Sequence, residues 1–502
     1  MRADSHATGR KMRRRLFAVL GAFAIGAALL VTGCTTILPD PPASPAAAPA
    51  LPSSVPRTTG ADTPAMREHK RLIAIFGGEY HAPAAERLLN DVLAKIAPAS
   101  DVPGEPYKVT LLNSPVVNAF ALPSGNIYVT RGLLALANDT AEIAAVMAHE
   151  IGHITAHHAS QRAELERRSF LVGRVVSEVL DKPDEGKQIA ARFQMSLASF
   201  SRQQELEADQ IGIRVIARAG FDPYAASRFL DLLGRSTSLR ASLLGQKPNG
   251  DQVDILSTHP STPERVAQAL AAARQIGAPG IGEDARDAYL NAIQGIAYGD
   301  DPAQGFIRGR LFLHPKLGFA FTAPEAFVLE NSAQAVLGIA GGGAEALRLD
   351  RVEVPASTTL EAYLASGWIE GLKQSTIESL TINGLPAATA IAKGTEWTFR
   401  LTAIRFGTDV YRMIFATRNL TDDVDRQFRA SMESFHRMSQ EEAASARPLR
   451  IEIVTAGPGD TAESLAARMP VPERPVEHFL LLNGLDKPDS VKSGQRYKVI
   501  AE

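Results

Sequence analysis

The feature that most constrains this chain is the apolar run Ala141–Ala156, which carries two histidines four residues apart. The run contains good helix formers, no proline and one glycine, so it predicts a helix. Positions i and i+4 share one face of a helix, so His149 and His153 can offer imidazole nitrogens to one point. Glu150 projects beside them and can reach a metal-bound water without binding the metal. This H-E-x-x-H arrangement predicts a zinc site, which still requires a third protein ligand.

The length of 502 residues exceeds that of a usual single domain and suggests about three domains of ~150 residues each. The chain is 45% hydrophobic and 22% charged, which is ordinary for a soluble globular protein. Its formal net charge of −2 gives no reason to expect nucleic acid as a partner. The single cysteine, Cys34, excludes an intramolecular disulfide and directs attention to the N-terminus.

Residues 1–33 have the pattern of a signal peptide. Basic residues precede the apolar run Leu16–Val31, and small residues lead to Cys34. This resembles the bacterial lipobox, in which the cysteine is lipidated and becomes the mature N-terminus. A transmembrane anchor is the alternative, but the run is shorter than the ~20 residues that a span prefers. Thr35, in place of Asp, resembles outer-membrane lipoproteins, and residues 34–64, rich in Pro and Ala, predict a flexible tether.

Residues 65–280 have the pattern of a mainly helical domain with a small sheet. Downstream of the histidine motif, a predicted helix at 201–220 carries Glu205 and Asp209 one turn apart, so both can face the same site. A further helix is expected to begin at 261–264, where hydroxyl residues precede a proline. The other predicted elements are helices at 68–76 and 84–96 and strands at 107–112, 116–122 and 127–130.

Several separated motifs in this region resemble the M48 family of zinc metallopeptidases. Besides His149–His153, the resemblance rests on the segments Asn118–Gly125, Ser201–Asp209, Ala219–Pro223 and Ser257–Pro260. It covers roughly residues 65–277 and is similar to the exported, β-barrel assembly-enhancing branch of the family. That branch carries tetratricopeptide repeats after its catalytic domain, whereas the sequence shows no repeat of that period.

The resemblance implies one zinc ion per chain, held by His149, His153 and Glu205 and completed by water. It implies that Glu150 is the general base, which takes a proton from that water and hands it to the leaving amine. It also implies that Asp209 accepts a hydrogen bond from a ligating histidine and thereby fixes the tautomer of that histidine.

The same resemblance assigns roles to two other places. The strand with Asn118, Ala119, Phe120 and Ala121 is implied to lie at a sheet edge beside the cleft, where an extended substrate can add to it. An ordinary structural strand is the alternative. His259 matches a histidine that can occupy the fourth zinc position in close relatives, so we expect it to be a gate. His157 follows His149 by eight residues on the same helix face and is the alternative to His259 for that position. We expect instead that the two histidines at 157–158 lie on a helix surface.

Residues 281–305 are expected to form a linker, and residues 306–440 predict an α+β domain of unknown role. Residues 449–502 predict a β-α-α-β unit that resembles the LysM module, which binds glycan chains such as peptidoglycan; pure docking is the alternative. The predicted fold class is therefore α+β. It comprises a mainly helical zincin-type metallopeptidase domain with a small edge sheet, an α+β domain and a small βααβ LysM-like domain.

Together these features predict a zinc metalloendopeptidase of the Gram-negative envelope, lipid-anchored at the periplasmic face of the outer membrane. The expected substrates are unfolded or misassembled envelope proteins, with peptidoglycan as a second expected partner and no nucleic acid. Two alternatives stay open. One is an envelope chaperone or scaffold with little proteolysis. The other is a protein that the LysM-like unit docks on peptidoglycan, where its peptidase would act on cell-wall peptides.

Overall fold

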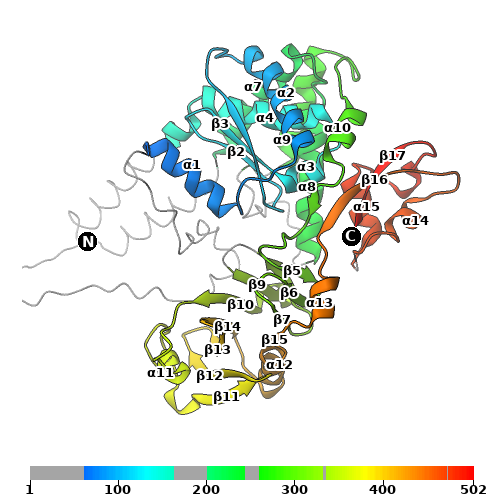
Figure 1. The fold of residues 1–502 in the computed structure, drawn as a ribbon. Helices are drawn as coiled ribbons and strands as arrows, with labels where there is room; N and C mark the ends of the chain where they lie inside the picture. Colours follow the sequence, from blue (N-terminus) through cyan, green and yellow to red (C-terminus); the bar gives the residue numbers. More distant parts are fainter. Residues whose placement is uncertain (1–61, 163–199, 244–258, 260, 332–334, 472) are drawn as a thin grey trace, which may run out of the picture. The chain divides into compact units, whose positions relative to one another are not determined.

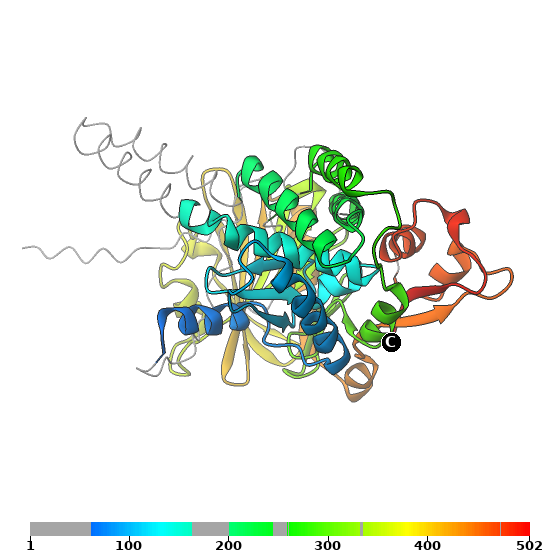
Figure 2. The ribbon, with the colours of Figure 1, turned by 90° about the horizontal axis from the view of Figure 1, so that it is seen from above.

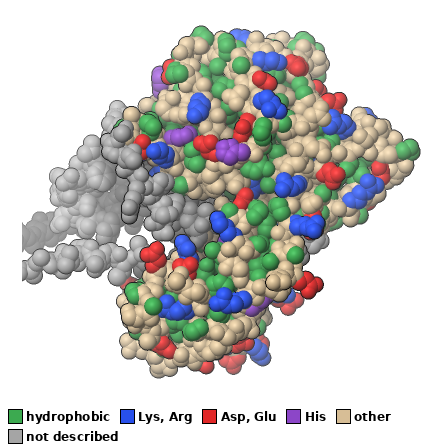
Figure 3. Space-filling view, in the orientation of Figure 1, with side chains coloured by type: hydrophobic (Ala, Val, Ile, Leu, Met, Phe, Trp, Pro, Cys, Tyr) green, Lys and Arg blue, Asp and Glu red, His purple; other side chains and the backbone are tan. Residues whose placement is uncertain are grey.

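The computed structural model describes residues 62–162, 200–243, 259, 261–331, 335–471 and 473–502 (Figure 1). The predicted signal peptide, Cys34 and almost all of the predicted tether lie outside these ranges. None of the described helices is long and apolar enough to cross a membrane. Acidic and basic side chains of the described residues are interspersed on the face that Figure 3 shows.

The first part of the chain combines helices with a three-stranded sheet. Its elements are α1 Pro64–Ile75, α2 Pro83–Ala99, β1 Lys108–Leu112, β2 Ala119–Ala121, β3 Asn126–Thr130, α3 Arg131–Leu136, α4 Thr140–Thr155, α7 Arg202–Arg218, α8 Ala225–Leu243, α9 Pro263–Ile276, α10 Arg286–Ile293 and β4 Ala297–Tyr298. The strand order is β1-β3-β2, with β1 parallel and β2 antiparallel to the central β3. The predicted helices and strands of this region are confirmed, and β2 lies at one edge of the sheet.

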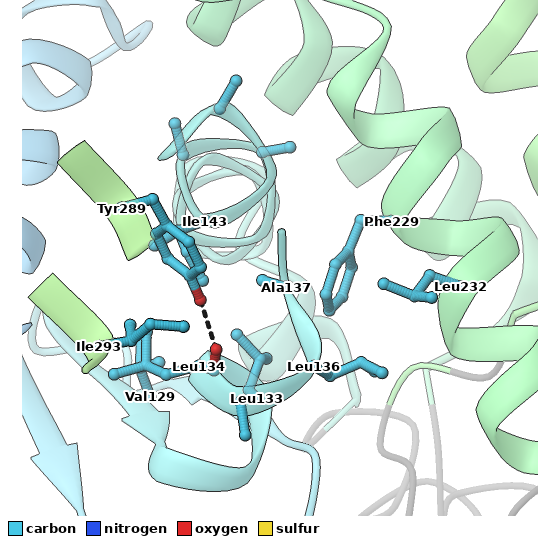
Figure 4. Packing of buried hydrophobic residues seen from close by; sticks show 14 of the residues in the cluster. Val129, Leu133, Leu134, Leu136, Ala137, Ile143, Phe229, Leu232, Tyr289 and Ile293 are labelled. Atoms are coloured by element: carbon cyan, nitrogen blue, oxygen red, sulfur yellow. Dashed lines mark hydrogen bonds between the residues drawn. The ribbon is translucent and has the colours of Figure 1, made fainter. Parts of the chain in front are cut away.

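The motif helix α4 is the centre of this part and packs against α2, α7 and α8 (Figures 1 and 2). Asp139 caps its N-terminus by accepting a hydrogen bond from the backbone N–H of Glu142. Apolar side chains of α4 join the largest hydrophobic core, part of which Figure 4 shows. In that view Tyr289 of α10 donates a hydrogen bond to the carbonyl oxygen of Leu134. Because most of α4 is buried, the motif is held in one position.

The middle part is rich in antiparallel strands. Its elements are β5 Phe306–Arg308, β6 Leu311–His314, β7 Phe319–Thr322, β8 Val328–Asn331, β9 Ala335–Ala340, η2 Gly341–Gly343, β10 Glu345–Val352, α11 Leu360–Leu364, η3 Gln374–Thr376, β11 Glu378–Ile382, β12 Leu385–Lys393, β13 Thr398–Phe406, β14 Asp409–Thr417, α12 Asp422–Glu433 and β15 His436–Arg437. A seven-stranded sheet has the order β11-β12-β13-β14-β10-β9-β8, and a four-stranded sheet has the order β15-β7-β6-β5. Successive β14 residues Met413 and Ile414 enter different cores, so both faces of the large sheet are covered.

The C-terminal part forms the predicted β-α-α-β order. Its elements are α13 Gln440–Ser445, β16 Leu449–Thr455, α14 Ala462–Ala466, α15 Pro475–Leu482, η4 Pro488–Ser490 and β17 Arg496–Ala501. β16 pairs antiparallel with β17 and, at its start, with β4 of the first part. Ile451, Phe479 and Val499 belong to the same hydrophobic core as α4. The unit is therefore packed onto the first part through a continuous apolar core.

Lys498 adds a polar contact to this packing. The side chain is fully buried, and its Nζ donates hydrogen bonds to the carbonyl oxygens of Ala135, Leu136 and Ala137 at 2.8, 3.1 and 2.6 Å. These carbonyls end α3, where a helix leaves acceptors without partners and favours a cation. A residue of the last strand thus caps the helix that immediately precedes the motif helix.

In these parts of the chain the structure differs from the sequence analysis in two places. Residues 281–305, expected to form a linker, contain α10 and β4, and the α10 side chains Tyr289, Leu290 and Ile293 are fully buried. Eight helical residues are too few for periodicity to distinguish them from a loop. α8 was not predicted, because its second half is rich in serine and contains Gly234, and these are poor helix formers.

Candidate metal centre

Two helices bring the predicted site residues together. α4 carries His149, Glu150 and His153, and α7 carries Glu205 in its first turn. All four are buried, with exposed fractions of 8%, 2%, 4% and 2% in that order. Ser201 caps the N-terminus of α7 in a capping box, and it lies where the sequence predicts that this helix begins. The cap fixes where α7 begins and therefore where Glu205 lies.

Two glycines allow α4 and α7 to approach closely. A Cβ on Gly152 of α4 would lie 3.0 Å from the carbonyl oxygen of Ala208 and 3.2 Å from its Cα. A Cβ on Gly212 of α7 would lie 3.0 Å from the backbone nitrogen of His149. Any side chain at either glycine would press on the backbone of the facing helix. The two glycines therefore set the distance at which Glu205 meets the histidines.

Ligand atoms of four residues converge on one point. One such atom each from His149, His153, Glu205 and His259 lies within 4.8 Å of all the others. Nε2 of His149 is 3.0 Å from Nε2 of His153 and 3.5 Å from Oε2 of Glu205. Nε2 of His153 is 3.7 Å from Oε1 of Glu205. Zinc–nitrogen bonds of ~2.0–2.1 Å place the corners of a tetrahedron about 3.3 Å apart, within the range of these spacings.

The chemistry of the donor set also fits zinc. Imidazole nitrogens and a carboxylate oxygen are ligands that zinc accepts in tetrahedral sites. The Nε2 atoms of His149 and His153 face each other at 3.0 Å, so at most one of them can carry a hydrogen there. A shared cation satisfies both lone pairs at once. His149, His153 and Glu205 are therefore the residues that would hold the zinc ion.

His259 supplies a fourth donor. Its Nδ1 lies 3.2 Å from Nε2 of His149 and 2.9 Å from Oε1 of Glu205. Its Nε2 lies 3.5 Å from Oε1 of Glu150. The histidine that the resemblance marks as a gate thus stands at the remaining corner of the cluster and contacts the predicted general base.

An ion pair supports the ligands from behind. Asp209 Oδ1 lies 2.9 Å from Nδ1 of His149, which is the contact predicted for it. Arg265 of α9 donates to Asp209 from Nε and Nη2, both at 2.8 Å, and its Nη1 lies 2.8 Å from Oε2 of Glu205. Sequence reasoning missed Arg265, because no local pattern marks it and only tertiary packing brings α9 against α7.

The charges of the cluster shift its ionisation. Burial lowers the pKa of His149, but Asp209 and Glu205 outweigh burial and raise the pKa to about 10. Burial raises the pKa of Glu205, but His259 and His149 more than reverse that effect and hold the pKa well below its ordinary value. The metal-free cluster therefore holds a proton on His149 beside ionised carboxylates. Binding of a cation must displace that proton.

Two hollows adjoin the donor cluster. One is a groove of about 560 Å³, whose walls include Phe76, Phe120 and Glu150. The other is a small cavity of about 70 Å³, which Glu150 and His259 also line. The other walls of this cavity are mainly apolar and include Leu133, Ala145, Val146, Phe229 and Leu230.

The predicted edge strand runs along the larger groove. Asn118, Phe120 and Ala121 contribute to its wall. The Phe120 ring stacks on Tyr128 at a centroid distance of 4.8 Å and contacts Phe76, just after α1, at 5.0 Å. In the described part of the chain, β2 pairs with β3 alone. Its outer edge therefore pairs with no described strand, and an extended peptide could add to it.

The expectation that both histidines after the motif lie on a helix surface is wrong. α4 ends at Thr155, and His157 is exposed with a left-handed backbone (φ 55°). The turn at His157 directs His158 inward, where it is fully buried and its Nδ1 lies 3.0 Å from Nδ1 of His153. A helix-length estimate from composition cannot place such a turn, because Ala and His residues do not mark the end of the helix.

Comparison with known proteins agrees with this geometry. Residues 83–273 match the family model described as Peptidase family M48. The chain is 37% identical over 169 residues to the mitochondrial metalloendopeptidase OMA1 of Arabidopsis thaliana, a match that covers 34% of this chain and 32% of that protein. It is 31% identical over 217 residues to the beta-barrel assembly-enhancing protease of Escherichia coli (strain K12), covering 41% and 42%, respectively. The matched region thus spans less than half the length of either relative.

Proposed function

Residues 83–273 form a domain of peptidase family M48, and on this premise we propose that the protein is a zinc-dependent metalloendopeptidase of the cell envelope. The observation that carries the proposal is the convergence of His149, His153 and Glu205, with Glu150 beside them. Zinc bound there would polarise the scissile carbonyl and lower the pKa of a water toward ~7.

The chain's own residues would perform the proton transfers. Glu150 lies at the junction of the groove and the cavity, so its carboxylate can reach both the attacking water and the scissile bond. It takes the proton from the water and delivers it to the leaving amine. Asp209, with Oδ1 2.9 Å from Nδ1 of His149, would hold the ring hydrogen on Nδ1 and keep Nε2 free to bind the metal.

Substrate would bind as an extended strand along β2. Backbone hydrogen bonds to the outer edge of β2 would hold a peptide without reading its side chains, which suits unfolded or misassembled proteins. The cavity beside Glu150 would accept one side chain next to the scissile bond. Its apolar walls and small volume favour a small aliphatic side chain there.

The sequence and the relatives support a proposal for the cellular setting. One relative is named for β-barrel assembly, and we propose a comparable task of envelope protein quality control for this chain. Lipidation at Cys34 and the following tether would anchor the enzyme at the periplasmic face of the outer membrane.

A second candidate function rests on the C-terminal unit. Its β-α-α-β order and its likeness to LysM support docking on peptidoglycan, and the protein would then act as a scaffold, a chaperone or a cell-wall peptidase. Cleavage of casein but not of sacculi by purified protein favours the envelope protease, and the reverse result favours the cell-wall role.

The central test is Glu150→Gln in the full chain. The substitution keeps the shape of the side chain but removes the base, so we expect one zinc ion per chain in both proteins and loss of casein cleavage in the variant alone. Complementation of a deletion strain by the variant would favour the chaperone or scaffold instead. A chain that binds no zinc, or a variant that still cleaves casein, would show that the proposal is wrong.

A further inference from the structure

His158 is a buried side chain that neither the motif nor the proposed mechanism uses. It is 0% exposed, whereas its neighbour His157 is exposed. Its imidazole meets the ring of His153 edge-on, at a centroid distance of 4.9 Å and an interplanar angle of 73°. The two Nδ1 atoms are 3.0 Å apart, which is a hydrogen-bonding distance.

The hydrogens of this contact follow from the position of the ligand nitrogen. Nε2 of His153 faces the donor cluster and must be free of hydrogen to bind a metal, so the hydrogen of that ring is on Nδ1. His153 Nδ1–H then donates to Nδ1 of His158, whose own hydrogen is on Nε2. That Nε2 lies 3.4 Å from Oε2 of Glu207 and donates to it. In this hydrogen-bond relay from His153 through His158 to Glu207, every donor meets an acceptor.

Phe200 holds the same ligand from another side. Its ring stacks on His153 at a centroid distance of 4.1 Å and an interplanar angle of 28°. Stacking restricts the plane of the His153 ring, but a 180° flip about the Cβ–Cγ bond keeps that plane and moves both ring nitrogens. The contact at Nδ1 favours the flip state in which Nε2 faces the donor cluster.

The two ligands of α4 therefore have different supports. His149 rests on Asp209, whose carboxylate is held by two hydrogen bonds from Arg265. Behind His153 stands a second imidazole, followed by Glu207, whose side chain is 53% exposed. The first support is ionic and buried, and the second runs from the ligand to the protein surface.

We propose that His158, backed by Glu207, is a positioning residue that fixes the tautomer and orientation of His153 for the metal. The inference rests on the proposed zinc site, but it concerns a contact that the H-E-x-x-H motif does not include. Hydrogen-bond partners of metal-ligating histidines typically contribute 10–100-fold to metal affinity. Loss of the acceptor at His158 should therefore loosen the metal while leaving the three ligands in place.

The test compares two substitutions of similar size in the full chain. In His158→Asn the amide oxygen can take the place of Nδ1 as acceptor, whereas His158→Leu fills the space without an acceptor. Zinc affinity is measured by competition with a chelator, and the absorption bands of the Co²⁺-substituted protein report the ligand geometry. His157→Asn is the matched control, because His157 is exposed and asparagine tolerates its left-handed backbone.

We expect His158→Leu to weaken zinc binding by about 10–100-fold and to shift the cobalt bands, and His158→Asn to restore most of both. Glu207→Ala should weaken binding less, because its end of the relay is exposed to water. Equal losses in the Leu and Asn variants, or no loss in either, would overturn the inference while the zinc site itself stands. Absence of zinc binding in the unmodified chain would instead overturn the proposed function, and the relay with it.

Discussion

Gly212 of α7 lies directly against the backbone of His149, so close that a Cβ there would be 3.0 Å from the His149 nitrogen. Gly212→Ala should force α4 and α7 apart and move Glu205 away from the histidines, so zinc affinity should fall by about tenfold. Competition with a chelator measures this. Gly234→Ala in α8 is the control, since its Cβ would meet only the Ser261 side chain at 3.4 Å. Alanine favours the helix more than glycine does, so this variant should be more stable by up to about 1 kcal/mol. Unchanged zinc affinity in Gly212→Ala would contradict this account of the close packing.

His259→Ala should open the fourth corner of the donor cluster. His259 Nδ1 lies 3.2 Å from Nε2 of His149, so its removal frees room for water beside Glu150. We expect higher basal casein cleavage, with zinc retained by the three remaining ligands. Cleavage rates and the cobalt spectrum measure the two effects. If both stay as in the unmodified chain, His259 is not a gate.

Glu142 should make stability depend on pH. Burial, reinforced by Asp139, raises the pKa of this carboxyl from 4.5 to about 7. Because the pKa is higher in the folded state, folding favours the protonated form. The contribution is full below about pH 4.5 and is lost as the pH rises through about 7.

Glu142→Gln is neutral at every pH and should lack this loss. Relative to the unmodified chain, its free energy of unfolding should rise by about 3 kcal/mol between about pH 4 and pH 8. Urea unfolding at both ends of that range measures the difference. Glu325→Gln, at an exposed position, serves as the control for the same substitution outside the core. A pH-independent difference for Glu142→Gln would show that Glu142 is not the group responsible.

Lys498→Met should loosen the contact between the C-terminal unit and α3. Three carbonyl oxygens would lose their donor, which lowers the free energy of unfolding by about 1–3 kcal/mol each. Removal of a buried ammonium offsets part of this loss. We expect a net loss of about 3 kcal/mol in the free energy of unfolding, measured by urea denaturation. Lys492→Met, on the exposed loop before β17, is the matched control. Equal urea midpoints for the two variants would mean that the hydrogen bonds of Lys498 do not contribute to stability.

Local sequence patterns predict the helices that carry the proposed metal ligands. The apolar run around His149 and His153 predicts α4, and the spacing of Glu205 and Asp209 predicts that both face one side of α7. These predictions succeed because helical periodicity and capping depend on residues only a few positions apart. The same holds for the C-terminal β-α-α-β order, whose turn residues mark each change of direction.

Tertiary structure alone decided which side chains support those ligands. Packing of α9 brings Arg265 to the site, and a turn at His157 brings His158 there. No local sequence pattern marks either contact. Lys498 reaches α3 across more than 350 positions of the chain, and burial in a shared core, rather than any motif, places it there. The sequence by itself determined the helices and the ligand types, because both arise from short-range spacing. The distances, partners and charges around the ligands came from packing between distant segments, which no single segment encodes.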